Sequence, residues 1–234
     1  FPSKVNSILL VERLFFGDLI VITPVIRALK QKFPEANIDV IVQPSMVDVL
    51  EGNPYINKIL PYSDKELKNT KGVSAALRGK YDLGIMLNYG SYAISKILRD
   101  ANIPYRIGST KAGFLVGKGF FLSRKTKPCF GIKHKVEHHM DVVRTIGVDT
   151  EDKHLEVSIP AEANRAVEKF LSANGISKKD LVVVIHAAPQ HRTHRWFSNR
   201  FAYMADKLIE NHKVNIVFSG AEKDKPIIES IQNL

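Results

Sequence analysis

The sequence has little cysteine and no long apolar run. Cys129 is the one cysteine among 234 residues, so the chain has neither an internal disulfide nor a cluster of thiolate metal ligands. No uninterrupted apolar segment reaches the roughly 20 residues that a membrane-spanning helix needs, and no secretory signal is visible. The single cysteine suits a reducing cytoplasm, so we expect a cytoplasmic protein whose contact with a membrane, if it has one, is peripheral.

Acidic residues are missing between residues 101 and 136, although the chain holds 24 of them. The formal charge of +10 is concentrated in residues 1–150, which have a net charge of +9, whereas residues 151–234 have a net charge of +1. The acid-free stretch interleaves apolar side chains with these cations: Arg106, Lys111, Lys118, Arg124, Lys125, Lys127, Lys133 and Lys135. This mixture favours an anionic membrane surface or a phosphorylated amphiphile, and a solvated loop is the alternative. No nucleic-acid motif accompanies the charge, so we expect no nucleic-acid partner.

The rest of the sequence is typical of a soluble α/β protein, with 44% hydrophobic and 25% charged residues. Short β-branched runs alternate with helical patterns, which predicts parallel sheets flanked by helices. Strands are predicted at residues 8–11, 38–42, 56–60, 83–87, 181–185 and 214–219, and helices at residues 18–33, 45–51, 64–78, 140–146, 163–174 and 199–211. Loops and a short hairpin are predicted within residues 101–136. Polar residues at 149–153 predict a linker between domains at residues 1–150 and 151–234.

The Gly17-Asp18 pair lies where the first predicted strand runs into a helix. Asp18 is therefore expected at the carboxyl end of a strand, the edge at which open α/β sheets bind ligands. A carboxylate there, shielded by Phe15 and Phe16, can act as a general base, or it can cap the helix by accepting backbone amides. Pro24 lies inside the same helical pattern, so either the helix kinks there or Thr23 begins a second segment.

A second concentration of polar side chains follows the predicted strand at residues 181–185. The loop at 186–196 holds two arginines and three histidines before a helix, whose N-terminal amides favour anions. Phosphate binding is the prediction, and a metal site is the rival. Because no acidic residue accompanies the histidines and no zinc spacing is present, we expect no metal.

Three further positions lie beyond predicted strands. Glu222 and Asp224 follow the strand at 214–219, where an acid either holds ribose hydroxyls or caps the last helix. Tyr89 and Ser91 follow the strand at 83–87 and are candidates for binding a substrate, with plain packing as the alternative.

Several motifs also occur in a defined order, at residues 11–18, 23–29, 33–34, 51–56, 81–83, 106–108, 134–148, 195–196 and 201–202. This succession covers nearly the whole chain. It resembles glycosyltransferase family 9, the heptosyltransferases of lipopolysaccharide core assembly.

The resemblance implies a GT-B-like architecture of two Rossmann-like domains with parallel sheets. Residues 1–150 would bind the acceptor, and residues 151–234 would be part of a nucleotide-sugar-binding domain. The implied activity is that of an inverting glycosyltransferase, which moves a heptose from ADP-heptose to the lipopolysaccharide inner core, needs no cofactor and uses Asp18 as its base. Expected donor residues are Gly17, His186, Arg192, Thr193, His194, Arg195, Glu222 and Asp224. Expected acceptor residues are Tyr89, Ser91, Arg106, Lys118, Arg124, Lys125 and Lys127.

Two departures from the family pattern affect the donor side. His194-Arg195-Trp196-Phe197 stands where the family usually has Lys-Arg-Trp-Pro, and the Asp-Thr-Gly-x-x-His element is missing before Leu234. We therefore expect the second domain to be incomplete and these 234 residues to be inactive by themselves. A nicotinamide oxidoreductase is disfavoured because Gly-x-Gly-x-x-Gly is absent. The competing hypothesis is a non-catalytic basic module that binds anionic lipid or nucleic acid.

Overall fold

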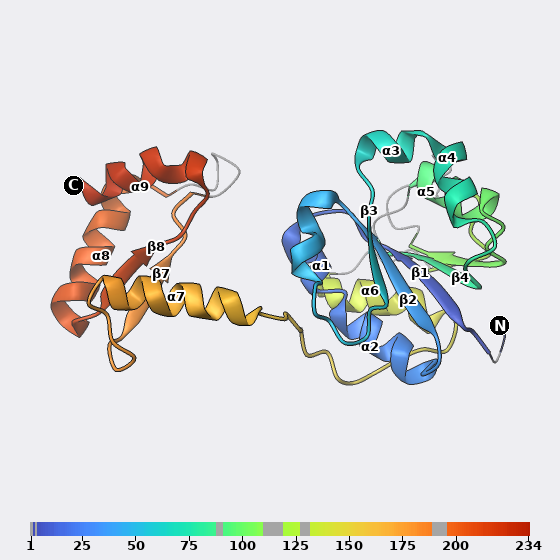
Figure 1. Cartoon of the computed structure of the whole chain (residues 1–234), viewed down its shortest axis with the longest axis horizontal. Coiled ribbons are helices and arrows are strands. Elements are labelled where there is room, and N and C mark those ends of the chain that lie inside the picture. Colours follow the sequence, from blue (N-terminus) through green and yellow to red (C-terminus); the bar gives the residue numbers. More distant parts are fainter. Residues whose placement is uncertain (1, 3, 88–90, 110–118, 127–131, 189–195) are drawn as a thin grey trace. The chain divides into compact units, whose positions relative to one another are not determined.

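The computed structural model describes residues 2, 4–87, 91–109, 119–126, 132–188 and 196–234. The chain divides into two compact units, Phe1–Pro160 and Ala161–Leu234, which we call unit 1 and unit 2 (Figure 1). None of the described helices combines the length and apolar character that crossing a bilayer requires.

Unit 1 is built on a parallel sheet of six strands in the order β3-β2-β1-β4-β5-β6. The strands are β1 (Ser7–Val11), β2 (Asn37–Val42), β3 (Lys58–Pro61), β4 (Leu83–Met86), β5 (Tyr105–Gly108) and β6 (Arg124–Lys125). This order reverses direction between β1 and β4. In doubly wound sheets such a reversal opens a crevice at the carboxyl ends of the two strands, where ligands bind.

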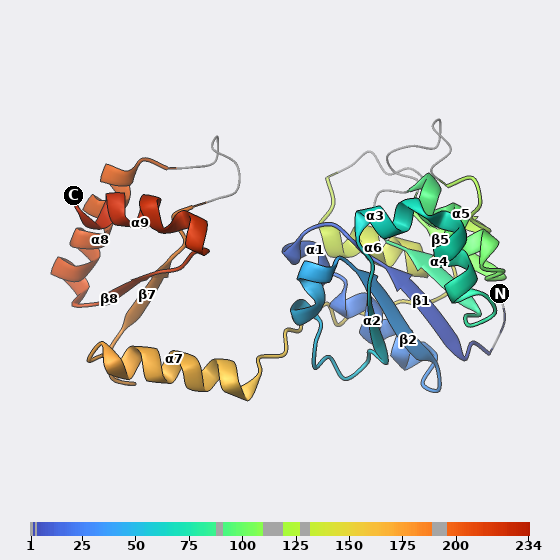
Figure 2. The same cartoon turned by 45° about the horizontal axis from the view of Figure 1, so that its top comes forward.

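Helices cover both faces of this sheet (Figure 2). They are α1 (Phe16–Ile20), α2 (Thr23–Lys32), α3 (Asp64–Lys68), α4 (Thr70–Leu77), α5 (Tyr92–Asp100) and α6 (Lys135–Arg144), with a 3-10 turn η1 (Pro44–Val49). Successive residues of β1 face opposite sides, so Ile8 and Leu10 belong to the core beneath α2 and α6, whereas Leu9 and Val11 belong to the core beneath α4 and α5. The result is a three-layer α/β unit with two buried cores.

Two sequence-based expectations are resolved within unit 1. The helical pattern at 18–33 forms two helices, and Pro24 occupies the second position of α2, where its missing N–H costs nothing. The hairpin expected within residues 101–136 is wrong, because β5 and β6 pair in parallel. Parallel neighbours need a long crossover connection instead of a tight turn.

Residues 151–160 pack with unit 1, so the division falls ten residues beyond the expected boundary at 150. The cause is Arg27, a buried side chain of α2. Its Nη1 donates to Glu156 at 2.7 Å and its Nη2 donates to the carbonyl oxygen of His154 at 2.8 Å. A buried guanidinium needs such partners, and this requirement holds the segment against α2.

Unit 2 contains a two-stranded parallel sheet, β7 (Val182–Ile185) with β8 (Asn215–Phe218). Its helical elements are α7 (Ala161–Ala173), α8 (Ser198–His212), the 3-10 turn η4 (Glu222–Asp224) and α9 (Lys225–Gln232). Its apolar core cluster consists of Ile185, Ala187, Ala205 and Ile231. The predicted strands and helices of this region are thus present, and the expected α/β class is confirmed in both units.

Candidate active site

Asp18 lies just beyond the carboxyl end of β1, at the reversal of strand order. Its side chain is buried, and its Oδ2 accepts the N–H of Phe15 at 2.9 Å. Its other oxygen, Oδ1, forms an ion pair with the ammonium group of Lys135 on α6. One oxygen of Asp18 therefore caps α1, while the other is paired with a cation.

The loop from β1 to α1 is held by two carboxyl groups. Glu12 Oε1 accepts the N–H of Arg13 at 2.8 Å and the N–H of Leu14 at 3.1 Å. Together with the bond from Phe15 to Asp18, these contacts satisfy three consecutive amides and fix the backbone that presents Asp18. Phe15 and Phe16 are 62% and 55% exposed, whereas Asp18 itself is buried.

Glu12, which precedes Asp18 in this loop, is fully buried. Burial raises its pKa to about 7, against the opposing effect of the Leu14 and Arg13 amides. The negative charge of Asp18 raises the pKa of Glu12 further, and the Lys135 ammonium lowers it. Glu12, Asp18 and Lys135 therefore form one electrostatically coupled group.

His139 extends this group from α6, one helical turn beyond Lys135. The ring is buried, and its Nδ1 lies 3.2 Å from the carbonyl oxygen of Leu87, just after β4. Burial, aided by the charge of Lys135, lowers the pKa of His139 to about 4, so the imidazole is neutral at neutral pH. Since a carbonyl oxygen only accepts, Nδ1 carries the hydrogen and Nε2 is an acceptor, with no partner among the described residues.

Residues 72–234 match the model of glycosyltransferase family 9 (heptosyltransferase). The chain belongs to this family. A curated relative, lipopolysaccharide heptosyltransferase 3 from Escherichia coli, is 26% identical to this family 9 chain over 220 residues. The alignment covers 90% of the chain and 63% of the relative, so the chain spans less than two thirds of that protein.

Solved structures show the same fold. The family 9 glycosyltransferase from Veillonella parvula aligns with a TM-score of 0.83 at 22% identity, over 97% of this chain and 66% of its own. ADP-heptose lipopolysaccharide heptosyltransferase II from E. coli aligns with a TM-score of 0.72 at 19% identity, over 97% of this chain and 69% of its own. The GT-B-like α/β fold expected from the sequence is therefore confirmed.

The expected acceptor residues of this family 9 chain are engaged in local contacts where the structure describes them. Ser91 Oγ accepts the N–H of Ile94 and caps α5. Arg106 Nε donates to the carbonyl oxygen of Phe121 at 2.7 Å, and Arg124 Nη1 donates to that of Thr145 at 2.7 Å. Within the described part of the chain, no hydrogen bond or ion pair joins Ser91, Arg106 or Arg124 to Asp18. Lys125 belongs to β6, whereas Tyr89, Lys118 and Lys127 lie outside the described residues.

The expected donor residues divide between the two units. A Cβ placed at Gly17 would meet no atom within 4 Å, so Gly17 itself borders open space. In unit 2, His186 is exposed and its Nδ1 lies 3.0 Å from the carbonyl oxygen of Ser219. Asp224 accepts the N–H of Ala221 at 2.9 Å, and Glu222 pairs with Lys225 at 2.6 Å. The described residues hold no group of three or more candidate metal ligands, and Arg192, Thr193, His194 and Arg195 lie outside them.

Three members of the coupled group were not assigned a role from the sequence: Glu12, Lys135 and His139. Two signals for them were present. Glu12 directly continues the apolar run of β1, where an acidic side chain must be buried. Lys135 and His139 are four residues apart, which places them on one face of a helix.

Proposed function

We propose that this chain supplies the general base of an inverting glycosyltransferase, which moves a heptose from ADP-heptose to the lipopolysaccharide inner core. The observation that carries the proposal is the buried carboxylate of Asp18, paired with Lys135 at the carboxyl ends of β1 and β4. Membership of family 9 supports the class of reaction. The choice of donor is supported by E. coli heptosyltransferase WaaC, a protein of the same fold whose structures contain ADP and ADP-2-deoxy-2-fluoro heptose.

In the proposed step, an acceptor hydroxyl attacks the anomeric carbon of the heptose from the face opposite the diphosphate. The new glycosidic bond forms while the bond to the diphosphate breaks, and ADP departs. Asp18 takes the hydroxyl proton on Oδ1, while the Phe15 amide keeps Oδ2 fixed. Lys135 forms an ion pair with this carboxylate before the acceptor arrives.

The departing diphosphate carries negative charge that must be offset. We assign this role to cationic side chains and backbone amides of the loop at 186–196, and chiefly to Arg192 and Arg195.

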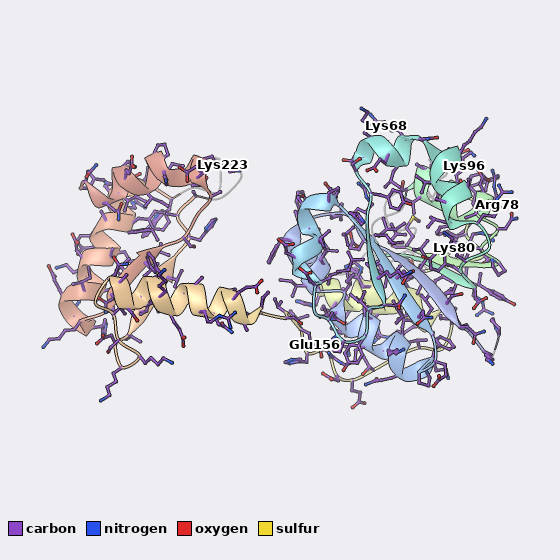
Figure 3. All side chains as sticks on the ribbon, viewed as in Figure 1. Lys68, Arg78, Lys80, Lys96, Glu156 and Lys223 are labelled. Atoms are coloured by element: carbon purple, nitrogen blue, oxygen red, sulfur yellow. The ribbon has the colours of Figure 1, made fainter. Side chains whose placement is uncertain are left out.

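The proposed acceptor is an anionic amphiphile at the inner face of the membrane, and unit 1 has a surface suited to it. Basic side chains lie on and beside α3, α4 and α5, among them Lys68, Arg78, Lys80 and Lys96 (Figure 3). Near α5, the guanidinium of Arg99 lies 3.9 Å from the ring centroid of Phe121, and Phe120 is 71% exposed. Cations beside exposed aromatic rings favour an anionic lipid surface.

The test is mass-spectrometric detection of heptose transfer by the protein that carries this chain, with ADP-heptose and an inner-core acceptor. Asp18→Asn should lower kcat by about 100-fold or more and leave the Kd for ADP-heptose unchanged, because it removes a proton acceptor and preserves shape. Asp48→Asn, at an exposed position of η1, is the matched control and should retain the full rate. A near-normal rate for Asp18→Asn would leave Asp18 with its capping role alone.

A further inference from the structure

A polar cavity of about 380 Å³ lies on unit 1, over the edge of the sheet formed by β2 and β3 and beside the end of α4. Its lining includes Ser7, Asn37 and Lys58, which are the first residues of β1, β2 and β3. Asp18, in contrast, follows the last residue of β1, and the five residues of this strand span about 16 Å. The polar part of the cavity is therefore separate from the proposed base.

A buried carboxylate lines this cavity. Asp39 is 8% exposed, and its Oδ2 accepts the hydroxyl of Tyr81 at 2.7 Å. Its Oδ1 accepts the side-chain amide of Asn57 at 2.8 Å. A carboxylate has about four acceptor positions, and these two bonds are the ones that Asp39 makes through its side chain among the described residues. Asp39 can therefore accept further hydrogen bonds from the hydroxyl groups of a ligand.

Two exposed ammonium groups line the same cavity, those of Lys58 on β3 and Lys80 beyond α4 (Figure 3). Lys58 is the direct neighbour of Asp39 in the register of β2 and β3. Opposite charges at such positions can pair across strands, but Asp39 is bound by the neutral groups of Tyr81 and Asn57 instead. Within the described part of the chain, neither lysine forms an ion pair. The cavity therefore offers one anionic acceptor and two separate cations.

This set of groups suits a ligand that carries both hydroxyl groups and a phosphate. The hydroxyl groups would donate to Asp39 and accept from the amides of Asn37 and Asn57, and the phosphate would take the two ammonium groups. Leu60 and Tyr62 supply apolar surface for the carbon face of a sugar ring. The lysines disfavour a cationic ligand, and the buried carboxylate disfavours a purely apolar one.

We propose that this cavity is a second ligand site of unit 1, which binds a phosphorylated sugar. Asp39 recognises the sugar hydroxyls, and Lys58 and Lys80 recognise the phosphate. The volume falls in the range of small-molecule sites, about 300 to 1,000 Å³. The inference goes beyond the proposed function and does not require Asp18 to be a base.

The first test is a titration of the nitrogen-15-labelled full chain with glucose 6-phosphate, followed by amide NMR and calorimetry. The amides at the start of β2 and β3 should shift and saturate. Glucose and inorganic phosphate should each bind at least about fivefold more weakly, because each provides only part of the contacts. No saturable binding would overturn the proposal. Equal affinity for inorganic phosphate would show a simple anion site and would overturn the assignment to a sugar.

The second test uses variants of the cavity. The double variant Lys58→Met and Lys80→Met should weaken the binding of glucose 6-phosphate by about tenfold and leave that of glucose unchanged, since both lysines are exposed and only the phosphate contacts are lost. Asp39→Asn should weaken the binding of both. Lys32→Met, at the exposed end of α2, is the matched control and should keep the wild-type affinity. Wild-type affinity in the double variant would overturn the proposal.

A free sugar phosphate and the phosphorylated saccharide of a glycolipid share this chemistry. Vesicles that contain phosphorylated core lipopolysaccharide distinguish them: a shift of the same amides identifies the glycolipid as the source, and its absence beside glucose 6-phosphate binding identifies the free sugar phosphate. None of these measurements uses heptose transfer, so failure of the cavity proposal and failure of the proposed function are distinguishable.

Discussion

The two units of the chain differ in how completely their sheets are covered. In unit 1, β1 has a partner on each edge and helices on each face, and Ile8, Leu9 and Leu10 are completely buried. In the described part of unit 2, β7 pairs with β8 alone, Val184 in its centre is 63% exposed, and α7 contains no buried residue. The same local patterns form strands and helices in both units, but among the described residues the larger sheet is buried more completely.

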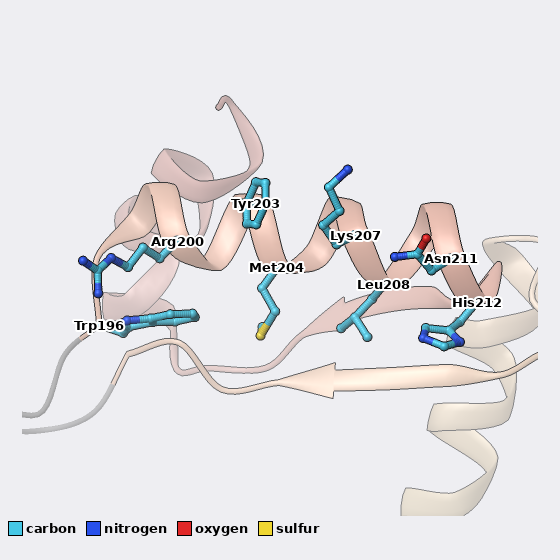
Figure 4. Close-up of a pocket in the computed structure, with 8 residues that line it drawn as sticks. All are labelled: Trp196, Arg200, Tyr203, Met204, Lys207, Leu208, Asn211 and His212. Carbon is cyan, nitrogen blue, oxygen red and sulfur yellow. The ribbon is translucent and has the colours of Figure 1, made fainter.

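An open groove runs along α8 of unit 2 (Figure 4). It has a volume of about 480 Å³ and is lined by Trp196, Arg200, Tyr203, Met204, Lys207, Leu208, Asn211 and His212.

Two-stranded sheets are marginally stable by themselves and need further strands or packed helices. The contrast shows that element type is specified locally, whereas stability depends on how many neighbours an element gains.

The strongest test of this contrast compares two mid-strand truncations. Ile85→Ala in β4 should destabilise unit 1 by about 4 kcal/mol, because it leaves a cavity in a fully buried core. Val184→Ala in β7 should cost unit 2 less than about 0.5 kcal/mol, since that side chain already faces solvent. Hydrogen exchange of the β4 and β7 amides measures both effects. Equal losses at the two positions would show that unit 2 is as well packed as unit 1.

Unit 1 also contains a buried acid that should give its stability a pH dependence. The pKa of Glu12 is raised in the folded state, so its contribution is fully present below the unfolded value of 4.5 and is lost as the pH rises through about 7. Glu12→Gln removes this loss and should gain about 3 kcal/mol relative to the wild type between pH 4.5 and 7.5. Urea unfolding across this range measures the difference.

Glu66→Gln is the matched control for that experiment. The hydroxyl and amide of Ser63 lower the pKa of Glu66, so its contribution is present above the unfolded value and is lost as the pH falls. The stability of Glu66→Gln relative to the wild type should therefore fall as the pH rises, opposite to the trend for Glu12→Gln. The same sign in both variants would contradict the assignment of Glu12 as a buried, destabilised charge.

A smaller effect concerns the segment that unit 1 holds by Arg27. Arg27→Ala should destabilise unit 1 by about 2 kcal/mol, because the carboxylate of Glu156 and the carbonyl of His154 lose their partner. Residues 151–160 should then become sensitive to limited proteolysis. Arg165→Ala, at an exposed position of α7, should leave the cleavage pattern unchanged. Protection of the segment in Arg27→Ala would mean that other contacts hold it.

The smallest effect is expected on the surface of unit 2. Lys207 and Glu210 form an ion pair at 2.5 Å on α8, and both side chains are about half exposed. Solvent screens such pairs, so Lys207→Met should leave the stability of unit 2 essentially unchanged. A larger loss, measured by hydrogen exchange in α8, would show that the α8 surface contributes to stability.

The sequence predicted the elements better than their partners. The β-branched runs at residues 8–11 and 181–185 became β1 and β7, because local side-chain pattern is sufficient to favour a strand. The sequence also predicted that Asp18 lies at the end of a strand. Both β5 and β6 lie in the region predicted as loops and a short hairpin, so these two short strands and their parallel pairing were missed. Two strands separated by a long connection carry no local signal of their direction.

The surroundings of Asp18 show why the site was only partly predictable. Asp18 and Lys135 are 117 residues apart, and their contact depends on how α6 packs beneath the sheet. Charge by itself also did not predict the local contacts of the arginines. Arg106 and Arg124 were assigned to an anionic acceptor, but their guanidinium groups bind backbone carbonyls of unit 1. The acceptor role of these two residues stays a prediction, as does the donor role of the loop at 186–196.

The central position of β1 has a consequence for synthesis on the ribosome. Its partner β4 follows it by more than 70 residues, and the Asp82 carboxylate that binds the amide and hydroxyl of Ser7 is separated from Ser7 by 75 positions. At about 5 to 20 residues per second, the nascent chain carries β1 with one unpaired edge for several seconds. A chaperone that binds this apolar strand before β4 is translated would protect its unpaired edge until the sheet can form.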